Sequence, residues 1–474
     1  MKKILIIIAV LASLQSCNKF GNTNVSPTLL TTASTKGLFT NSIQNLNTYI
    51  TSARLGAMYV QYYAEGPYPA SSLYSDRNSS FAGWYTGPLY DLQTIIDYNT
   101  TGNGAASGNG SKNNQIAVAR ILKAFYFMNM TDIWGDIPYA DALGGDKNYK
   151  PKYDTQQSIY TALFKELTEA VAQINVAETS VAGDVLLNGD MAAWKRFANT
   201  IRLTMSLRLS KADAAKGKTE YAAALSAGVI TSNAQNINYK FIAGDPNNFN
   251  PWYNNYIISN RNDYAISTTM TSYMEPKADP RLKVYAENLA GNVVKGLPYG
   301  RNTAVNIPAA YSRIGDAFRA QSSPLTIFDY GQVLFMQAEA AKIGYTTGGE
   351  SDAEAKYKDA IKASWEKNGV YTFAAYNTYI ALPAVAYVAT SGYQRIMTEK
   401  WIHTYLQSHE PWKDWRRTGF PVLTAAADAV DSRGIPFRLG YAPTEASLNS
   451  ENYKIAVTAI GGTDDNYGKM WWAK

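Results

Sequence analysis

The chain has 474 residues with one cysteine, two histidines, 17% charged residues and 35 tyrosines against 15 phenylalanines. A single cysteine excludes an internal disulfide, a cysteine-rich zinc site and an iron–sulfur cluster. His403 and His409 do not have the i, i+4 spacing of a helical zinc site. The low charged fraction means that Asn, Ser, Thr and Tyr supply much of the polar surface, which favours a location outside the cytoplasm.

The formal net charge is +6, and two of the positive charges, Lys2 and Lys3, lie in a segment that we expect to be removed. The densest basic cluster, Lys413 with Arg416 and Arg417, also contains an acid and two tryptophans. Nucleic-acid-binding proteins usually carry a basic stripe and a higher charge density. The sequence therefore predicts no nucleic-acid partner.

The N-terminus has the pattern of an export signal. Two lysines precede an apolar stretch over residues 4–14, which reaches only about half of a hydrocarbon core and therefore indicates a signal peptide rather than a membrane-spanning helix. The next residues, LQSC at 14–17, resemble the lipobox of bacterial lipoproteins, although Gln15 departs from the small or branched residue usual there. We expect a lipoprotein signal peptide over 1–16 and acylation of Cys17. The alternative is an ordinary secretory signal with a cysteine at its cleavage site by coincidence.

Residues 17–35 are rich in Asn, Ser and Thr, which is typical of a flexible tether. We expect residues 36–474 to form a single domain.

Within this domain, apolar side chains recur at helical spacing. Three such stripes are Val118, Ile121, Leu122, Phe125 and Met128; Ile159, Leu163, Leu167, Val171 and Ile174; and Trp194, Phe197, Ile201 and Met205.

A helical hairpin is predicted near residues 334–367. Its second helix should begin at about Ser351, which forms a capping box with Glu354. In that helix Ala353, Tyr357 and Ala360 have the small–aromatic–small spacing of the rear helix of a tetratricopeptide repeat. The sequence thus predicts an all-α fold, with tetratricopeptide-like helix pairs and long loop-rich insertions that form a second face.

Long loops are predicted at 62–85, 99–114 and 245–263, and two of them are aromatic. Sugars stack their CH faces on aromatic rings and pair their hydroxyls with Asn, Asp and Arg. On residue chemistry alone, the candidate ligand-binding residues are Tyr68, Tyr74, Arg77, Trp252, Tyr253, Asn254 and Arg261. The alternative is that these aromatic rings pack the loops onto the scaffold, which is our prediction for Trp84.

Catalytic motifs are missing from the sequence. It has neither a G-x-S-x-G elbow nor a phosphate-binding loop, and no pair of acids is marked as a glycosidase pair. Asp132, Asp136 and Asp141 cluster around Gly135 and Pro138, which indicates a turn. We therefore predict a protein that is not an enzyme, with no cofactor, no metal site and no catalytic residue.

Six blocks of sequence match one pattern in order. They are ARILKAF with DIWGDIPY (119–125, 132–139), WKRFAN (194–199) with Leu203 and Arg208, DPRL (279–282), QAEAA (337–341), KW with WKDWRRTG (400–401, 412–419) and Pro421, and IPFR (435–438) with Tyr441, Pro443, Glu445 and Asn449. These blocks resemble those of the SusD/RagB family of Bacteroidota outer-membrane lipoproteins. The resemblance extends over essentially the whole mature chain.

The resemblance implies a non-enzymatic lipoprotein that covers a SusC-like TonB-dependent transporter, binds an oligosaccharide and delivers it for import. It also implies a location in the outer membrane, lipid-anchored and facing the cell exterior, although the acidic run of surface-exported lipoproteins is missing after Cys17. A peptide or another nutrient is the alternative ligand, and a surface glycoside hydrolase is the alternative class. We expect Asp414, Arg416 and Arg417 to form a buried ion network rather than to bind ligand.

Overall fold

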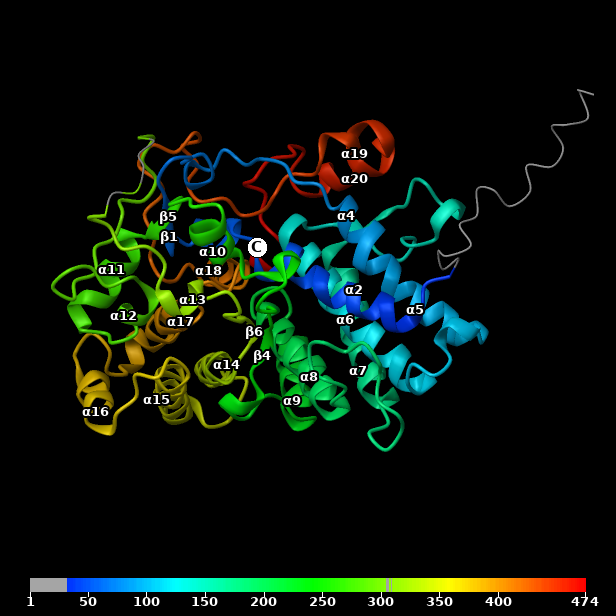
Figure 1. Cartoon of the computed structure of the whole chain (residues 1–474), viewed down its shortest axis with the longest axis horizontal. Helices are drawn as coiled ribbons and strands as arrows, with labels where there is room; N and C mark the ends of the chain where they lie inside the picture. The colour runs from blue at the N-terminus through cyan, green and yellow to red at the C-terminus, as the bar shows by residue number, and fades with distance from the viewer. Residues whose placement is uncertain (1–31, 304–306, 308) are drawn as a thin grey trace, which may run out of the picture. The chain divides into compact units, whose positions relative to one another are not determined.

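The computed structural model describes residues 32–303, 307 and 309–474 of the chain, and Thr35–Lys474 pack as one unit. The predicted lipidation site Cys17 and the signal peptide lie outside the described residues. Helices make up most of the unit, as predicted, and few strands are present in the described part (Figure 1).

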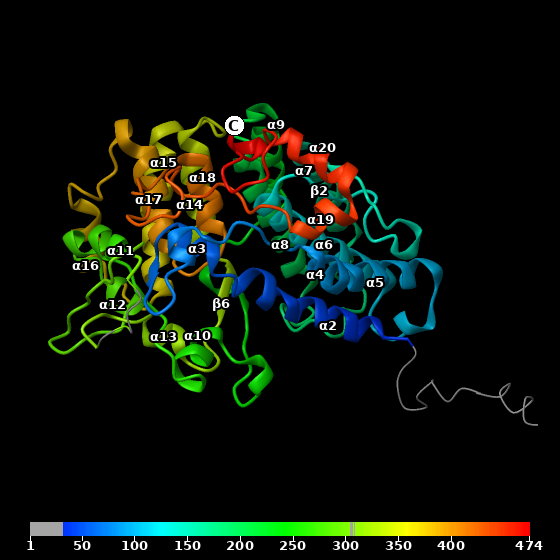
Figure 2. The same ribbon diagram turned by 90° about the horizontal axis from the view of Figure 1, so that it is seen from above.

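The first group of helices follows the predicted apolar stripes. Each helix of the group packs against the next helix of the group along the chain (Figure 2). The stripe residues Ile159, Leu163 and Leu167 are buried, as are Trp194 and Phe197. The members are α2 (Thr35–Leu46), α5 (Tyr90–Thr101), α6 (Lys112–Trp134), α7 (Gln156–Gln173), α8 (Met191–Arg208) and α9 (Ala214–Ser226).

The predicted loop at 99–114 is shorter than expected. The helix α5 continues to Thr101, and Gly102 ends it in the left-handed conformation with φ +73°. The next helix, α6, begins at Lys112, because the side chain of Ser111 caps it by accepting a hydrogen bond from the Asn114 backbone N–H at 3.2 Å. Short local caps therefore restrict the loop to residues 102–111.

The second group contains the predicted hairpin. Its helices are α14 (Tyr330–Lys342), α15 (Gly349–Lys367), α16 (Phe373–Ala381) and α17 (Gly392–His403). Helix α14 packs on both α15 and α17. In α15, Ala353, Tyr357 and Ala360 are buried as predicted, and the Tyr357 hydroxyl donates to the carbonyl of Val385 at 2.8 Å.

The predicted start of α15 is wrong by two residues. The helix begins at Gly349 with Gly348 as its N-cap, so Ser351 lies inside the first turn. The acids Glu350 and Asp352 sit in that turn, where the helix dipole favours negative charge. Glu354 does not complete a capping box but pairs with Lys358, one turn further on, at 2.6 Å.

Shorter elements make up the rest of the unit. The α-helices among them are α3 (Leu55–Tyr59), α4 (Ala82–Trp84), α10 (Pro251–Tyr253), α11 (Thr268–Met274), α12 (Leu282–Tyr285), α13 (Asp316–Arg319), α18 (Glu410–Thr418), α19 (Pro443–Leu448) and α20 (Ser450–Ala459). The 3₁₀ and π segments are η3 (Asn47–Thr51), η4 (Ser71–Leu73), η5 (Tyr85–Leu89), η6 (Gly104–Ala106), η7 (Gly145–Lys147), η8 (Asn233–Gln235), η9 (Pro246–Asn248), η10 (Asn254–Ile258), η11 (Glu275–Lys277), η12 (Ala389–Ser391) and η13 (Trp471–Ala473).

The strands form antiparallel pairs that join distant parts of the chain. They are β1 (Tyr63–Glu65) with β5 (Tyr264–Ile266), β2 (Ile137–Pro138) with β3 (Tyr153–Asp154), and β4 (Ile237–Tyr239) with β6 (Leu325–Phe328). The β1–β5 pair ties the two aromatic loops together, because the first loop follows β1 and the second precedes β5.

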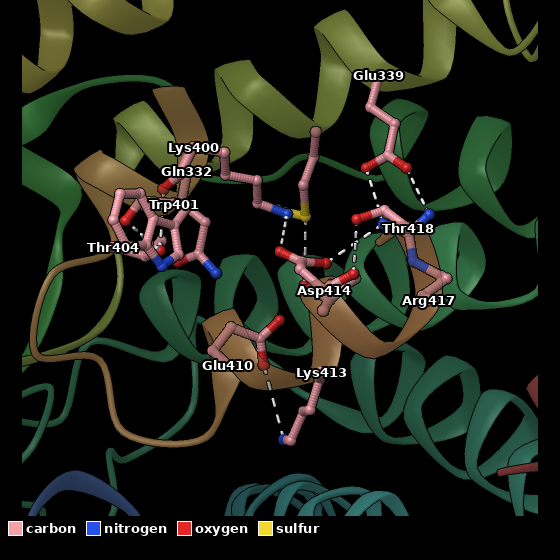
Figure 3. Close-up of polar contacts among 12 residues, drawn as sticks. Gln332, Glu339, Lys400, Trp401, Thr404, Glu410, Lys413, Asp414, Arg417 and Thr418 are labelled. Carbon is pink, nitrogen blue, oxygen red and sulfur yellow. Dashed lines mark hydrogen bonds and ion pairs between the residues drawn. The ribbon is translucent and has the colours of Figure 1, made fainter. Parts of the chain in front are cut away.

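The helix α18 carries the predicted ion network (Figure 3). The guanidinium of Arg417 pairs with Glu339 of α14, and Lys400 of α17 reaches Asp414 at 2.6 Å. The side chain of Arg416 lies 3.7 Å from the centre of the Trp412 ring and donates to backbone carbonyls. All of these residues are buried. The prediction of a buried ion network is therefore confirmed for Asp414 and Arg417, which join α18 to α14 and α17. It was wrong for Arg416, whose guanidinium is held by backbone carbonyls and an aromatic ring instead of a carboxylate.

Within the described part of the chain, no helix combines the length and the apolar character needed to cross a membrane.

Candidate ligand-binding surface

The β1–β5 pair brings the two predicted binding loops to one place. Glu65 at the end of β1 lies opposite Tyr264 at the start of β5. Just beyond the pair, the backbone N–H of Gly66 donates to the carbonyl of Asp263 at 2.9 Å. The chain leaving β1 and the chain entering β5 therefore start side by side.

Tyr68 and Arg261 meet across these loops. The Arg261 guanidinium lies 5.1 Å from the centre of the Tyr68 ring, and its Nε pairs with the Asp263 carboxylate at 2.9 Å. The Asp263 carboxylate also accepts from the Asn255 side-chain amide at 2.8 Å, and both bonds lie within the second loop. Tyr68 is 62% exposed. This pair thus presents an aromatic ring and a charged fork to solvent; we call it the Tyr68–Arg261 surface.

Trp252 supports this surface from within. Its ring is buried, packs edge to face on Tyr63 at 5.3 Å and on Tyr264 at 5.6 Å, and lies under the Arg54 guanidinium at 5.2 Å. A ring enclosed in this way has no free face for a sugar. The structure therefore argues against the predicted stacking role of Trp252 and favours packing of the loop onto the scaffold.

The residues that follow Trp252 differ in exposure. Tyr253 is half-buried, with its ring 5.4 Å from that of Phe249. Asn254 is exposed at the start of η10. Both are on the same short turn as Trp252, a few residues before Arg261 in the chain. Among the described residues, no hydrogen bond or ring contact joins them to Tyr68 or Arg261.

Tyr74 and Arg77, the other two predicted residues, contact C-terminal segments of the chain and not the Tyr68–Arg261 surface. Tyr74 is buried with φ +63°, and its hydroxyl accepts a hydrogen bond from the Ala426 backbone N–H at 2.9 Å. This internal bond makes it a packing residue. Arg77 is exposed, and its carbonyl accepts from the Gly440 N–H at 2.7 Å. Trp84, predicted to be a packing residue, is buried against Trp134 and Tyr126.

Glu65 is a residue that the sequence analysis did not select. Its carboxylate accepts from the Ser72 backbone N–H at 2.9 Å and from the Ser72 hydroxyl at 3.1 Å, which closes the loop that carries Tyr68. Burial raises the pKa of Glu65 to about 7. The only sequence signal was an isolated acid in an aromatic stretch, and the pairing with Ser72 is visible only in the fold.

The acids that cluster in the sequence serve the scaffold. Asp132 was predicted to lie in a turn, but it lies inside α6, where it pairs with Arg208 and accepts from the Tyr160 hydroxyl at 2.6 Å. The turn prediction was wrong for this residue because α6 continues through Asp132 to Trp134 as a buried helix. Asp136 accepts from the Gln156 backbone N–H at 2.8 Å. Among the described residues, no group of three or more His, Cys, Asp or Glu side chains could hold a metal ion.

Comparison with known proteins gives the class to which this fold belongs. Residues 26–442 match the model of the SusD-like family that is described as starch-binding and associating with the outer membrane. Because the match covers most of the chain, the protein belongs to this family, and the resemblance found in the sequence is confirmed. No curated protein sequence matches the chain.

Solved structures share the fold. A chitin-binding protein is 28% identical, with a TM-score of 0.79 and coverage of 93% of this chain and 100% of the other. A chitin-binding SusD homolog from Flavobacterium johnsoniae is 25% identical, with a TM-score of 0.76 and coverage of 93% and 98%. A SusD homolog from Bacteroides uniformis is 24% identical, with a TM-score of 0.78 and coverage of 93% and 99%. The predicted helical fold is thus confirmed.

Proposed function

We propose that this protein binds an oligosaccharide at the outer membrane and passes it to a SusC-like TonB-dependent transporter for import. Membership of a family described as starch-binding and outer-membrane-associated carries this proposal. The lipobox at Cys17 supports a lipid anchor, with a signal peptide over 1–16, a tether over 17–35 and the binding domain over 36–474. The anchored domain faces the cell exterior, where polysaccharide fragments arrive.

The binding site that we propose is the Tyr68–Arg261 surface. An exposed tyrosine ring offers a flat apolar face to the CH groups of a pyranose, and it loses little conformational entropy on binding. The guanidinium of Arg261 and the side-chain amide of Asn254, which lie on the same short segment of the chain, can donate hydrogen bonds to hydroxyl or carbonyl oxygens of the sugar. A binding protein needs no more chemistry than this, so we propose no catalytic residue.

Chitin binding by two relatives makes chito-oligosaccharides the first ligands to test, beside the starch fragments that the family description suggests. We expect Tyr68→Ala and Arg261→Gln each to weaken binding about tenfold or more, which corresponds to about 1.4 kcal/mol. Isothermal titration calorimetry of the purified mature chain measures this change.

Phe373→Ala is the matched control, because Phe373 is also a large exposed aromatic residue, 73% exposed, but lies on α16. Unchanged affinity of the Tyr68 and Arg261 variants for every bound oligosaccharide would remove the site from this surface. A peptide panel in the same titration tests the alternative cargo. Release of shortened products during incubation would contradict a pure binding role and support a hydrolase.

A further inference from the structure

A cleft shares no lining residue with the Tyr68–Arg261 surface, although the end of the first aromatic loop, residues 81–85, contributes to it. It has a volume of about 560 Å³ and is lined by residues of the segments 81–90 and 138–151 and by Glu445, Leu448 and Asn449 at α19. This volume is within the range of pockets that hold small organic ligands. None of the seven residues predicted from the sequence lines it.

The walls of the cleft are held by hydrogen bonds between distant segments. The Glu445 carboxylate accepts through Oε2 from the Tyr153 hydroxyl at 2.5 Å, and the Asn449 side-chain amide donates to the carbonyl of Pro151 at 2.8 Å. The Tyr85 hydroxyl donates to the carbonyl of Pro138. These bonds join α19, the β2–β3 region and η5, so the cleft exists before any ligand arrives.

Large apolar side chains stand exposed along the cleft. Tyr90 is 51% exposed, Tyr149 is 79% exposed and Leu448 is 68% exposed. The rings of Tyr90 and Tyr149 have no ring partner in the described part of the chain. Single exposed apolar residues are ordinary on a protein surface, but several around one preformed cleft indicate a surface that a ligand covers.

The polar groups of the cleft fit a neutral ligand rich in hydroxyls. Glu445 is the one charged residue in the lining, and its Oε1 has no hydrogen-bond partner among the described residues, so it is free to accept from a hydroxyl. Asn148 adds a side-chain amide, of which only the oxygen is engaged, by the Lys150 N–H at 3.1 Å. With no lysine or arginine in the lining, an anionic ligand finds no counter-charge.

We propose that this cleft is a second oligosaccharide-binding site, in which a pyranose unit packs on Tyr149 and Tyr90 and a hydroxyl donates to Glu445. The choice of ligand class rests on the proposed function. The position of the site does not, because its residues are separate from the Tyr68–Arg261 surface. A chain with two such sites holds two separate glycans at once.

The test uses the purified mature chain with chitohexaose and maltohexaose as probes, titrated by calorimetry. We expect the parent chain to bind two molecules of one of these probes. The double variant Tyr90→Ala/Tyr149→Ala should bind one, with the remaining affinity unchanged, whereas Tyr149→Phe, which keeps the ring, should bind two. Because both tyrosines are exposed, the melting temperature of the double variant should equal that of the parent.

The two proposals fail in different ways. If Tyr68→Ala/Arg261→Gln abolishes all binding, the second site is overturned and the proposed function stands. If only the Tyr90/Tyr149 variant loses binding, the second site stands and the Tyr68–Arg261 surface is overturned. Binding of neither hexasaccharide counts against both, and saturation of the cleft by an apolar dye that neither sugar displaces overturns the ligand class.

Discussion

At the scale of single residues, Glu65 couples the loop that carries Tyr68 to pH. Its ordinary pKa is 4.5, and burial raises the pKa in the folded chain to about 7. Between these values the folded state holds a proton that the unfolded state has released. This proton stabilises the fold below pH 4.5, and the stabilisation is lost as the pH rises to about 7.

The prediction concerns Glu65→Gln, a neutral mimic of the protonated acid. Deprotonation of Glu65 should lower the free energy of unfolding of the parent by an amount on the order of 2 kcal/mol between pH 4.5 and 7. The variant has no carboxyl group to titrate, so its free energy of unfolding should depend on pH less steeply by this amount. Urea unfolding across this range measures it. Glu275→Gln, at an exposed position on η11, is the control and should keep the slope of the parent. Equal slopes in all three proteins would contradict the assignment.

At the scale of elements, the ion network of α18 fixes three helices relative to one another. The Arg417 Nη2 atom lies 3.0 Å from a Glu339 carboxylate oxygen and 3.2 Å from an Asp414 carboxylate oxygen, while Lys400 of α17 pairs with Asp414 at 2.6 Å. Breaking a buried pair from one side leaves a charge that neither water nor a partner stabilises, which costs more than the pair itself contributes.

Arg417→Met should therefore lower the free energy of unfolding by about 3–5 kcal/mol, because Glu339 remains buried. The double variant Arg417→Met/Glu339→Met should recover a large part of this loss, and denaturant unfolding measures both. Arg433→Met is the surface control: Arg433 pairs with Asp431 at 2.6 Å but is 52% exposed, so its loss should lower the free energy of unfolding far less than Arg417→Met does. A double variant as unstable as the single one would show that shape rather than charge dominates.

The elements also show what the sequence could predict. Helical stripes such as Ile159, Leu163 and Leu167 depend on local spacing, so their buried faces could be read directly. The sequence could not show which of Tyr68 and Trp252 has the exposed ring, because both lie in aromatic loops. The difference in exposure comes from the β1–β5 pair, which joins residues about two hundred positions apart. The cleft lined by Tyr90, Tyr149 and Glu445 could not be predicted for the same reason, since the three segments that line it are far apart in the sequence.

At the scale of the whole molecule, function depends on where the binding domain is held. The transporter partner that we propose requires the domain to stay at the membrane, and Cys17 is the attachment point that we predict from the sequence. Each buried methylene of an acyl chain contributes about 0.8 kcal/mol, so attachment by several chains is effectively permanent, whereas a chain without them depends on contacts with the transporter alone.

Cys17→Ser should therefore move the protein from the membrane fraction to the soluble fraction of the producing cells, while glycan binding by the purified domain stays unchanged. Metabolic labelling with a fatty acid should mark the parent chain and not the variant. Because Cys17 is the one cysteine of the chain, the variant removes no disulfide, and a change in the fold cannot explain the result. Ser16→Ala is the control, since it keeps a small residue before the cysteine and should leave labelling intact. Labelling of the Cys17→Ser variant, or its full membrane retention without the transporter present, would contradict Cys17 as the anchor. A parent chain that takes up no label would leave an ordinary secretory signal as the interpretation of this N-terminus.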